Sequence, residues 1–215
     1  VYETHSLNLV NMDKVYLIPA QEILDSINTA LEEAMTTINE ECADVKDSVS
    51  VQEAIGNVDT MITDLTNAIQ TAYDDETLAS DYDNIVAPQE EIMTAIATLV
   101  ETARKAQADY ETEQALNAAY AEATEMVDSL TQMLADSMAV IEENCPNVKE
   151  SAVVTEGKTA IEGRIAALSE TIEAAKADGT LTTELENILA PKDEIAAAIA
   201  ALVETAQKAQ AEYEA

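Results

Sequence analysis

Apolar residues recur along this chain in steps of three and four, which places them on one face of an α-helix. The stripes lie at residues 20–42, 51–72, 92–110, 123–145, 154–175 and 195–213. Within them, Ser137 and Lys158 are the positions that weaken the apolar pattern. Polar and charged residues fill the positions between, as expected for helices that pack along a shared seam. The pattern predicts an all-α protein.

The stripes form two sets of three because the sequence repeats itself at an interval of 103 residues. Residues 19–112 align with residues 122–215 without a gap. We therefore predict two tandem three-helix bundles, one in residues 19–112 and one in residues 113–215. The first part of the second span, residues 113–121, is the predicted linker region. Residues 1–18 have no counterpart and are predicted to form an N-terminal tail.

Turn chemistry predicts where the helices begin and end. Asp44 and Asn147 stand where an N-cap oxygen would start the second helix of each bundle. Gly179 suits the left-handed conformation that ends this helix in the second bundle. Proline is tolerated at a first helical position, so Pro88 and Pro191 predict the start of each third helix.

The segment between Gln89 and Cys145 contains neither glycine nor proline. Because these are the residues that most readily stop a helix, nothing in the segment forces a break between the bundles. We predict one long continuous helix that joins them. The polar run at residues 111–114 interrupts the apolar stripe, so it marks the expected point of flexure.

The chain carries 43 acidic and 10 basic residues, a formal net charge of -33. This charge would repel nucleic-acid backbones and anionic lipids, so we expect no nucleic-acid partner. We expect no membrane insertion either, because no apolar run is long enough to span a bilayer. The charge predicts solvated helix faces, and binding of a basic protein or of cations is the alternative.

The sequence offers little for catalytic arrangements that depend on histidine. The single histidine is His5, in the predicted tail, so Ser-His-Asp and Cys-His arrangements are hard to build. Cys42 and Cys145 lie 103 residues apart, without the close spacing of a zinc or redox motif. We expect no enzyme activity and no cofactor. The two thiols are predicted to be buried and free, with an intermolecular disulfide or a folded-back arrangement left open.

One acidic stretch, DDETLASDYDN at residues 74–84, could hold a calcium ion loosely if its backbone folds back on itself. The candidate ligands are Asp74, Asp75, Asp81 and Asp83. A solvated turn between two helices is the favoured interpretation, and no other metal site is expected.

One closely retained stretch is VETARKAQADYE at residues 100–111, which returns as VETAQKAQAEYE at residues 203–214. Small residues on its apolar side let helices approach closely, which explains part of the similarity. Glu101, Lys105 and Gln107 are predicted to point outward, so packing does not explain why they are retained. Recent duplication or a shared contact surface would explain it. The candidate interaction residues are Glu101, Lys105, Gln107, Tyr110 and Tyr213. The tyrosines are favoured as core residues at the end of each bundle, with a recognition role as the alternative.

Two three-helix units bridged by VETARKAQADYETEQALNAAYAEATEMV, residues 100–127, resemble spectrin-type tandem repeats. The alanine-rich, acidic helical composition is similar to that of FIVAR-type modules of bacterial surface proteins. These resemblances imply a spacer or adhesion role at the surface of a bacterium or outside the cell. Neither resemblance assigns a functional residue.

The leading hypothesis is a non-enzymatic extracellular or cell-surface module that acts as a structural spacer or in protein interaction. The alternative is a binding module for a basic protein or a divalent cation. It would use the acidic helix faces and the loops before Pro88 and Pro191. The sequence allows a protein partner but does not identify it. We expect further domains of the same chain to flank this piece.

Overall fold

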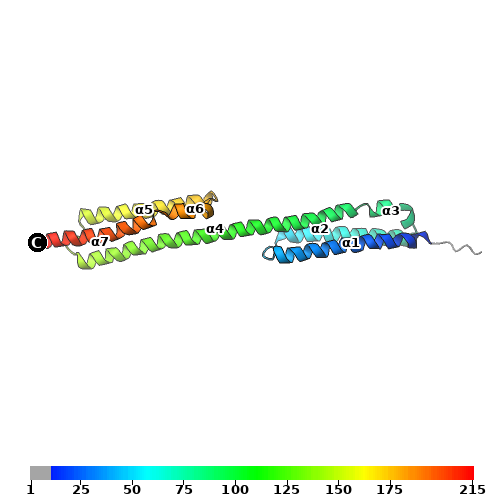
Figure 1. Cartoon of the computed structure of the whole chain (residues 1–215), viewed down its shortest axis with the longest axis horizontal. Coiled ribbons are helices and arrows are strands. Elements are labelled where there is room, and N and C mark those ends of the chain that lie inside the picture. The colour runs from blue at the N-terminus through cyan, green and yellow to red at the C-terminus, as the bar shows by residue number, and fades with distance from the viewer. Residues whose placement is uncertain (1–10) are drawn as a thin grey trace, which may run out of the picture. The chain divides into compact units, whose positions relative to one another are not determined.

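The computed structural model describes residues 11–215, which form α-helices joined by short turns and contain no β-strand (Figure 1). The prediction of an all-α protein is confirmed for these residues. The helices are α1 (Met12–Glu41), α2 (Val49–Asp74), α3 (Leu78–Val86), α4 (Gln89–Asn144), α5 (Ala152–Ala177), α6 (Leu181–Leu189) and α7 (Lys192–Glu214).

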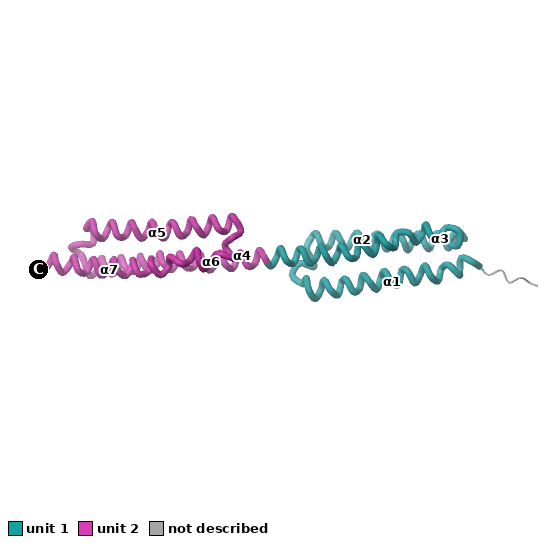
Figure 2. The backbone as a smooth tube through the Cα atoms, turned by 45° about the horizontal axis from the view of Figure 1, so that its top comes forward, with its two compact units in different colours: residues 1–111 teal, residues 112–215 magenta. Residues whose placement is uncertain are grey.

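The chain divides into two compact units, Val1–Glu111 and Thr112–Ala215 (Figure 2). Unit 1 contains α1, α2, α3 and the first part of α4, and unit 2 contains the rest of α4 with α5, α6 and α7. Helix α4 runs through the unit boundary as a single element of 56 residues. The prediction of one continuous helix is confirmed, because no residue within it interrupts the backbone hydrogen bonds.

In unit 1, the predicted stripes of α1, α2 and α4 meet in two neighbouring clusters of buried side chains. Ile27, Val58 and Ile92 bring the three helices together in the first cluster. Ile38, Val51 and Leu99 bring the same three helices together near the turn that follows α1. A fully buried Leu or Ile side chain contributes about 1.5–3 kcal/mol, so these seams account for much of the unit's stability.

In unit 2, one cluster of buried side chains extends through all of its helices. Ile141 of α4, Ile161 of α5 and Ile199 of α7 belong to it. Leu181 and Ile188 bring the short helix α6 into the same core. Lys158, which weakened the predicted stripe, is only partly covered, while the apolar positions around it are buried.

The second helix of each unit begins later than predicted. The N-cap of α2 is Ser48 and that of α5 is Ser151, rather than Asp44 and Asn147. The chain first makes a turn after α1, in which the N–H of Val45 donates to the carbonyl of Cys42. This turn buries Val45, which the helical stripes did not include, and it moves the helix start four residues on.

The end of each second helix follows the predicted turn chemistry in unit 2. Gly179 has a φ of 72°, the left-handed conformation predicted for it. At the position 103 residues earlier, Glu76 has a φ of 58°, although a side chain disfavours this region. The last helices then begin at Gln89 and Lys192, directly after Pro88 and Pro191, so the predicted starts are correct to within one residue.

Residues 12–18, which the repeat analysis assigned to a tail, form the first two turns of α1. The side chain of Asn11 accepts a hydrogen bond from the N–H of Lys14 and caps the helix. Asp13 Oδ1 accepts the N–H of Ala79 at 2.9 Å and so serves the open N-terminus of α3. These contacts have no equivalent in unit 2, which is why comparing the two halves of the sequence missed them.

Candidate interaction groove

The acidic residues proposed as calcium ligands lie exposed at the end of α2 and in α3. Asp74 accepts a hydrogen bond from Gln70 at 2.8 Å, and Asp81 accepts one from Asn84. Across residues 11–215, no three His, Cys, Asp or Glu side chains gather in a way that could hold a metal ion. The positions of Asp75 and Asp83 therefore add no metal-binding geometry to the acidic composition.

Both cysteines are buried and free, as predicted. Cys42 closes the α1 seam of unit 1 with no solvent exposure, and its burial, with the nearby Glu41 carboxylate, raises the pKa of the thiol. A raised pKa keeps the thiol protonated and unreactive at neutral pH. His5 lies outside the described residues.

The glutamines of the retained stretch have a structural role that the sequence did not reveal. Gln210 is buried, and its Oε1 accepts the N–H of Asn147 at 3.1 Å. Gln107 Nε2 instead donates to Asp44 Oδ2 at 3.0 Å. Gln107 thus joins α4 to the turn after α1, and Gln210 joins α7 to the turn after α4. Gln107, predicted to point outward, is half-buried, and its hydrogen bond to this turn is exposed.

The other candidate interaction residues of the retained stretch are exposed to solvent. Glu101 and Lys105 are exposed on α4, as predicted. Tyr110 is 37% exposed and Tyr213 is 68% exposed, so the favoured interpretation of these tyrosines as core residues is wrong.

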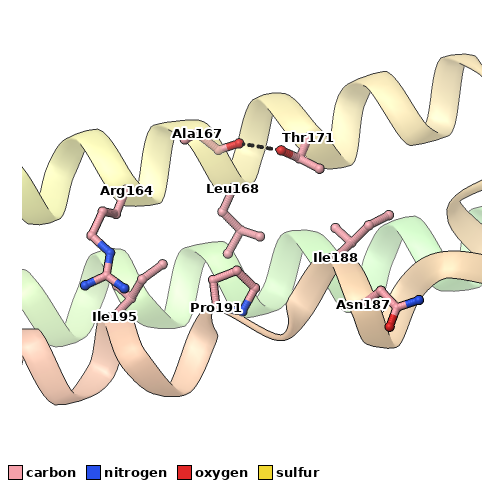
Figure 3. Close-up of a pocket in the computed structure, with 8 residues that line it drawn as sticks. All are labelled: Arg164, Ala167, Leu168, Thr171, Asn187, Ile188, Pro191 and Ile195. Atoms are coloured by element: carbon pink, nitrogen blue, oxygen red, sulfur yellow. Dashed lines mark hydrogen bonds between the residues drawn. The ribbon is translucent and has the colours of Figure 1, made fainter.

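Unit 2 has a groove between α5 and the α6–α7 segment, which we call the α5–α7 groove. Two hollows lie along it, of about 410 and 300 Å³. The first is lined by Arg164, Ala167, Leu168, Thr171, Asn187, Ile188, Pro191 and Ile195 (Figure 3). The second is lined by Val153, Gly157, Ala160, Ile161, Arg164, Ala198, Ala201, Leu202 and Thr205. Arg164 lines both hollows, so they adjoin.

The floor of the α5–α7 groove is made of small and apolar side chains at helical spacing. Gly157, Ala160 and Ala167 follow one another along α5, and Ala198 and Ala201 face them from α7. The helices approach closely here, because a Cβ added to Gly157 would lie 2.6 Å from Leu202 Cδ1. The groove is therefore shallow, narrow at its base and open along its length.

One ion pair crosses the α5–α7 groove. Figure 3 shows the side chain of Arg164 extending from α5 towards the segment that carries Ile195. Its guanidinium lies 3.1 Å from Glu194 Oε2, and both side chains are substantially exposed. An exposed pair of this kind contributes about 0–1 kcal/mol, so it can open at little cost.

A third hollow of unit 2, of about 560 Å³, lies between α4 and α5. Its walls include Val127, Leu134 and Ile165. Lys158 stands here at a seam position and pairs with Glu162 at 3.4 Å instead of filling the space. The sequence anomaly at Lys158 thus coincides with this hollow.

The geometry defines the chain as an all-α protein built from helical bundles. It does not identify a protein family. No protein-family model, no curated protein and no solved structure matches the chain. The resemblances to spectrin-type repeats and FIVAR-type modules therefore stay predictions. No helix in the described part of the chain is long and apolar enough to cross a membrane.

Proposed function

We propose that this chain is a non-enzymatic structural or protein-interaction module of a bacterial surface or secreted protein. The observation that carries the proposal is the distribution of side chains within each unit. The apolar seams are buried, and the exposed faces carry the carboxylates. Gln210 is the one buried polar residue among those described, and its hydrogen bond holds a turn.

We further propose that the two units derive from one duplicated bundle. The element lengths support this, since α2 and α5 each contain 26 residues and α3 and α6 each contain 9. Gln107 and Gln210 join corresponding turns and helices 103 residues apart. A module that repeats in this way extends a larger protein without needing an active site.

Binding of a basic protein partner is the second candidate function. The α5–α7 groove favours it, because an open apolar floor reaches Pro191 in a strongly acidic protein. A divalent cation is the weaker form of this candidate, since the described carboxylates form no cluster.

Two measurements test the proposed function. A panel of ester, phosphate, glycoside and peptide substrates should show no turnover above buffer. Turnover that is lost when a pair of carboxylates is substituted would refute the non-enzymatic role. Calorimetric titration with calcium should give no saturable heat, whereas a stoichiometric site lost on substitution of Asp81 would favour the cation-binding alternative.

A further inference from the structure

We propose that the α5–α7 groove of unit 2 binds a cationic amphipathic helix of a protein partner. The inference deepens the proposed function and rests on its protein-interaction form. The groove is a distinct surface because its floor is apolar and small while its margins carry acidic residues. Each of these features restricts the chemistry of the occupant.

The shape of the groove suits one helix. Its lining extends along α5 from Val153 to Thr171. At 1.5 Å per residue this is about 27 Å, which a helix of about 18 residues would cover. Gly157, Ala160 and Ala167 lie three and seven residues apart on one face of α5, with Arg164 between the last two. Small residues let two helices approach, so an occupant with an apolar stripe at helical spacing would complete a four-helix arrangement.

The charge around the groove selects a cationic partner. On α5, Glu156 lies four residues before Ala160 and Glu170 lies three residues after Ala167, so both carboxylates stand beside the floor. On α7, Glu194 lies four residues before Ala198 and Glu204 lies three residues after Ala201, and both glutamates are exposed. Lysine or arginine residues on either side of an apolar stripe would meet these carboxylates. A second copy of this chain, with its net charge of -33, would be repelled.

The Arg164–Glu194 pair would open when the partner binds. The two side chains are exposed, so separating them costs little, and a basic residue of the partner would take the place of Arg164 beside Glu194. Arg164 also repels a cationic occupant. Replacing it with methionine, the residue at position 61 of unit 1, should therefore tighten binding even though it removes a polar contact.

Unit 1 supplies the internal control. Its groove between α2 and α4, which we call the α2–α4 groove, has a hollow of about 320 Å³. This hollow corresponds to the second hollow of unit 2 at an interval of 103 residues. Asn57 and Thr98 stand here in place of Ala160 and Ala201. Glu91 and Glu101 keep the acidic margin at the positions of Glu194 and Glu204. The two grooves thus share three margin carboxylates. They differ in their floors and at position 164, where unit 2 has Arg164 and unit 1 has Met61.

The test uses the full chain and a fluorescent synthetic peptide of 18 residues, with leucine and alanine along one helical face and lysine on both flanks. A scrambled peptide of the same composition controls for charge alone. Fluorescence anisotropy at about 0.15 M salt, where exposed charges are screened beyond about 8 Å, compares the affinities. The amphipathic peptide should bind at least about tenfold more tightly than the scrambled one, because only it can cover the apolar floor.

Matched variants locate the binding site. Ala160→Arg with Ala201→Arg should weaken binding at least about tenfold, since the new side chains obstruct the floor and repel lysine. Asn57→Arg with Thr98→Arg changes the net charge equally and should change affinity less than about twofold. All four positions are exposed, and circular dichroism melts verify that each variant is folded. Arg164→Met should tighten binding about two- to fivefold.

Three outcomes would overturn the proposal: equal affinity for the two peptides, equal weakening by the two pairs of variants, or a chain dimer in sedimentation that the unit 2 variants abolish. If the peptide does not bind and the substrate panel stays silent, the groove proposal fails and the spacer role stands. Turnover in the panel would refute the proposed function, whether or not the peptide binds.

Discussion

The α5–α7 groove of unit 2 and the α2–α4 groove of unit 1 occupy positions 103 residues apart, yet they present different floors. In unit 2 the floor includes Ala160, Ala167 and Ala201. In unit 1 the residues at these positions are Asn57, Asp64 and Thr98. The polar side chains of unit 1 can be solvated without a partner, whereas the small apolar ones of unit 2 gain from being covered.

Both grooves are acidic at their margins, and unit 1 also has Asp64 on its floor and Met61 in place of Arg164, so charge does not favour unit 2. Glu53 and Glu91 of unit 1 stand where unit 2 has Glu156 and Glu194. A preference of the occupant for unit 2 should therefore follow from apolar burial, with electrostatics contributing attraction to both grooves.

Loss of a buried leucine below either groove should change stability the most. Leu99→Ala and Leu202→Ala should each lower the free energy of unfolding by about 2–4 kcal/mol, because each leaves a cavity. Urea denaturation followed by circular dichroism measures the change. A cost below about 1 kcal/mol for Leu202→Ala alone would mean that the core of unit 2 is looser than its burial indicates.

The next largest effect distinguishes the two glutamines. Gln210→Ala should cost about 1–2 kcal/mol, since it leaves the N–H of Asn147 without its acceptor in a partly buried site. Gln107→Ala should cost about 0.5–1 kcal/mol, because the hydrogen bonds of Gln107 to Asp44 and Glu111 are exposed. Equal costs in urea denaturation would contradict a larger role for the buried glutamine.

The turn after the second helix should respond in opposite directions in the two units. Gly179→Ala introduces a side chain at a φ of 72° and should destabilise by about 1 kcal/mol. Glu76→Gly relieves a φ of 58° and should stabilise by up to about 1 kcal/mol, partly offset by a more flexible unfolded chain. Thermal melts of both variants provide the measurement, and changes of the same sign would refute this explanation.

A smaller gain should come from the seam position occupied by Lys158. Ile55 stands 103 residues earlier and packs against the core of unit 1. Lys158→Ile should stabilise by about 0.5–1 kcal/mol, because it covers apolar wall in the hollow between α4 and α5 and forfeits only an exposed ion pair. Lys158→Gln serves as the control for charge, and an equal gain from it would exclude apolar burial as the cause.

The smallest effect is the alkaline pH dependence that Tyr82 contributes to unit 1. Burial raises the pKa of Tyr82, with the Asp83 carboxylate adding to it, and the position 103 residues later is Leu185. A raised pKa means that the folded state holds the proton more tightly than the unfolded state. This stabilisation is present below about pH 10 and is lost as pH rises through the folded pKa. The free energy of unfolding, measured by urea denaturation at pH 8 to 11, should therefore decline less steeply with pH in Tyr82→Phe than in the unsubstituted chain.

The helices and their cores could be predicted because the apolar stripes follow helical spacing over many turns. The long helix followed from the lack of glycine and proline between Gln89 and Cys145. The starts of α2 and α5 were misplaced because Val45 and Val148 are buried in the preceding turns, where helical periodicity does not apply. The first turns of α1 were missed because Asp13 acts on the distant N-terminus of α3.

The candidate site was less accessible to sequence reasoning. Gly157, Ala160 and Ala201 give a weak signal individually, since small residues at helical spacing fit a core as well as an exposed groove. Only their exposure on facing helices distinguishes the two. One signal could have identified the glutamines. Gln107 and Gln210 each directly follow an alanine of the apolar stripe, Ala106 or Ala209, and both copies keep the glutamine.

Hydrogen–deuterium exchange of the full chain, with and without the lysine-flanked peptide, tests the central claim most directly. Binding to the folded state should slow exchange in residues 153–171 and 188–205, because the peptide stabilises the helices that it contacts. Residues 50–68 and 85–102 of unit 1 should exchange as before. Equal slowing in both units, or no slowing at saturating peptide, would contradict a binding role specific to the α5–α7 groove.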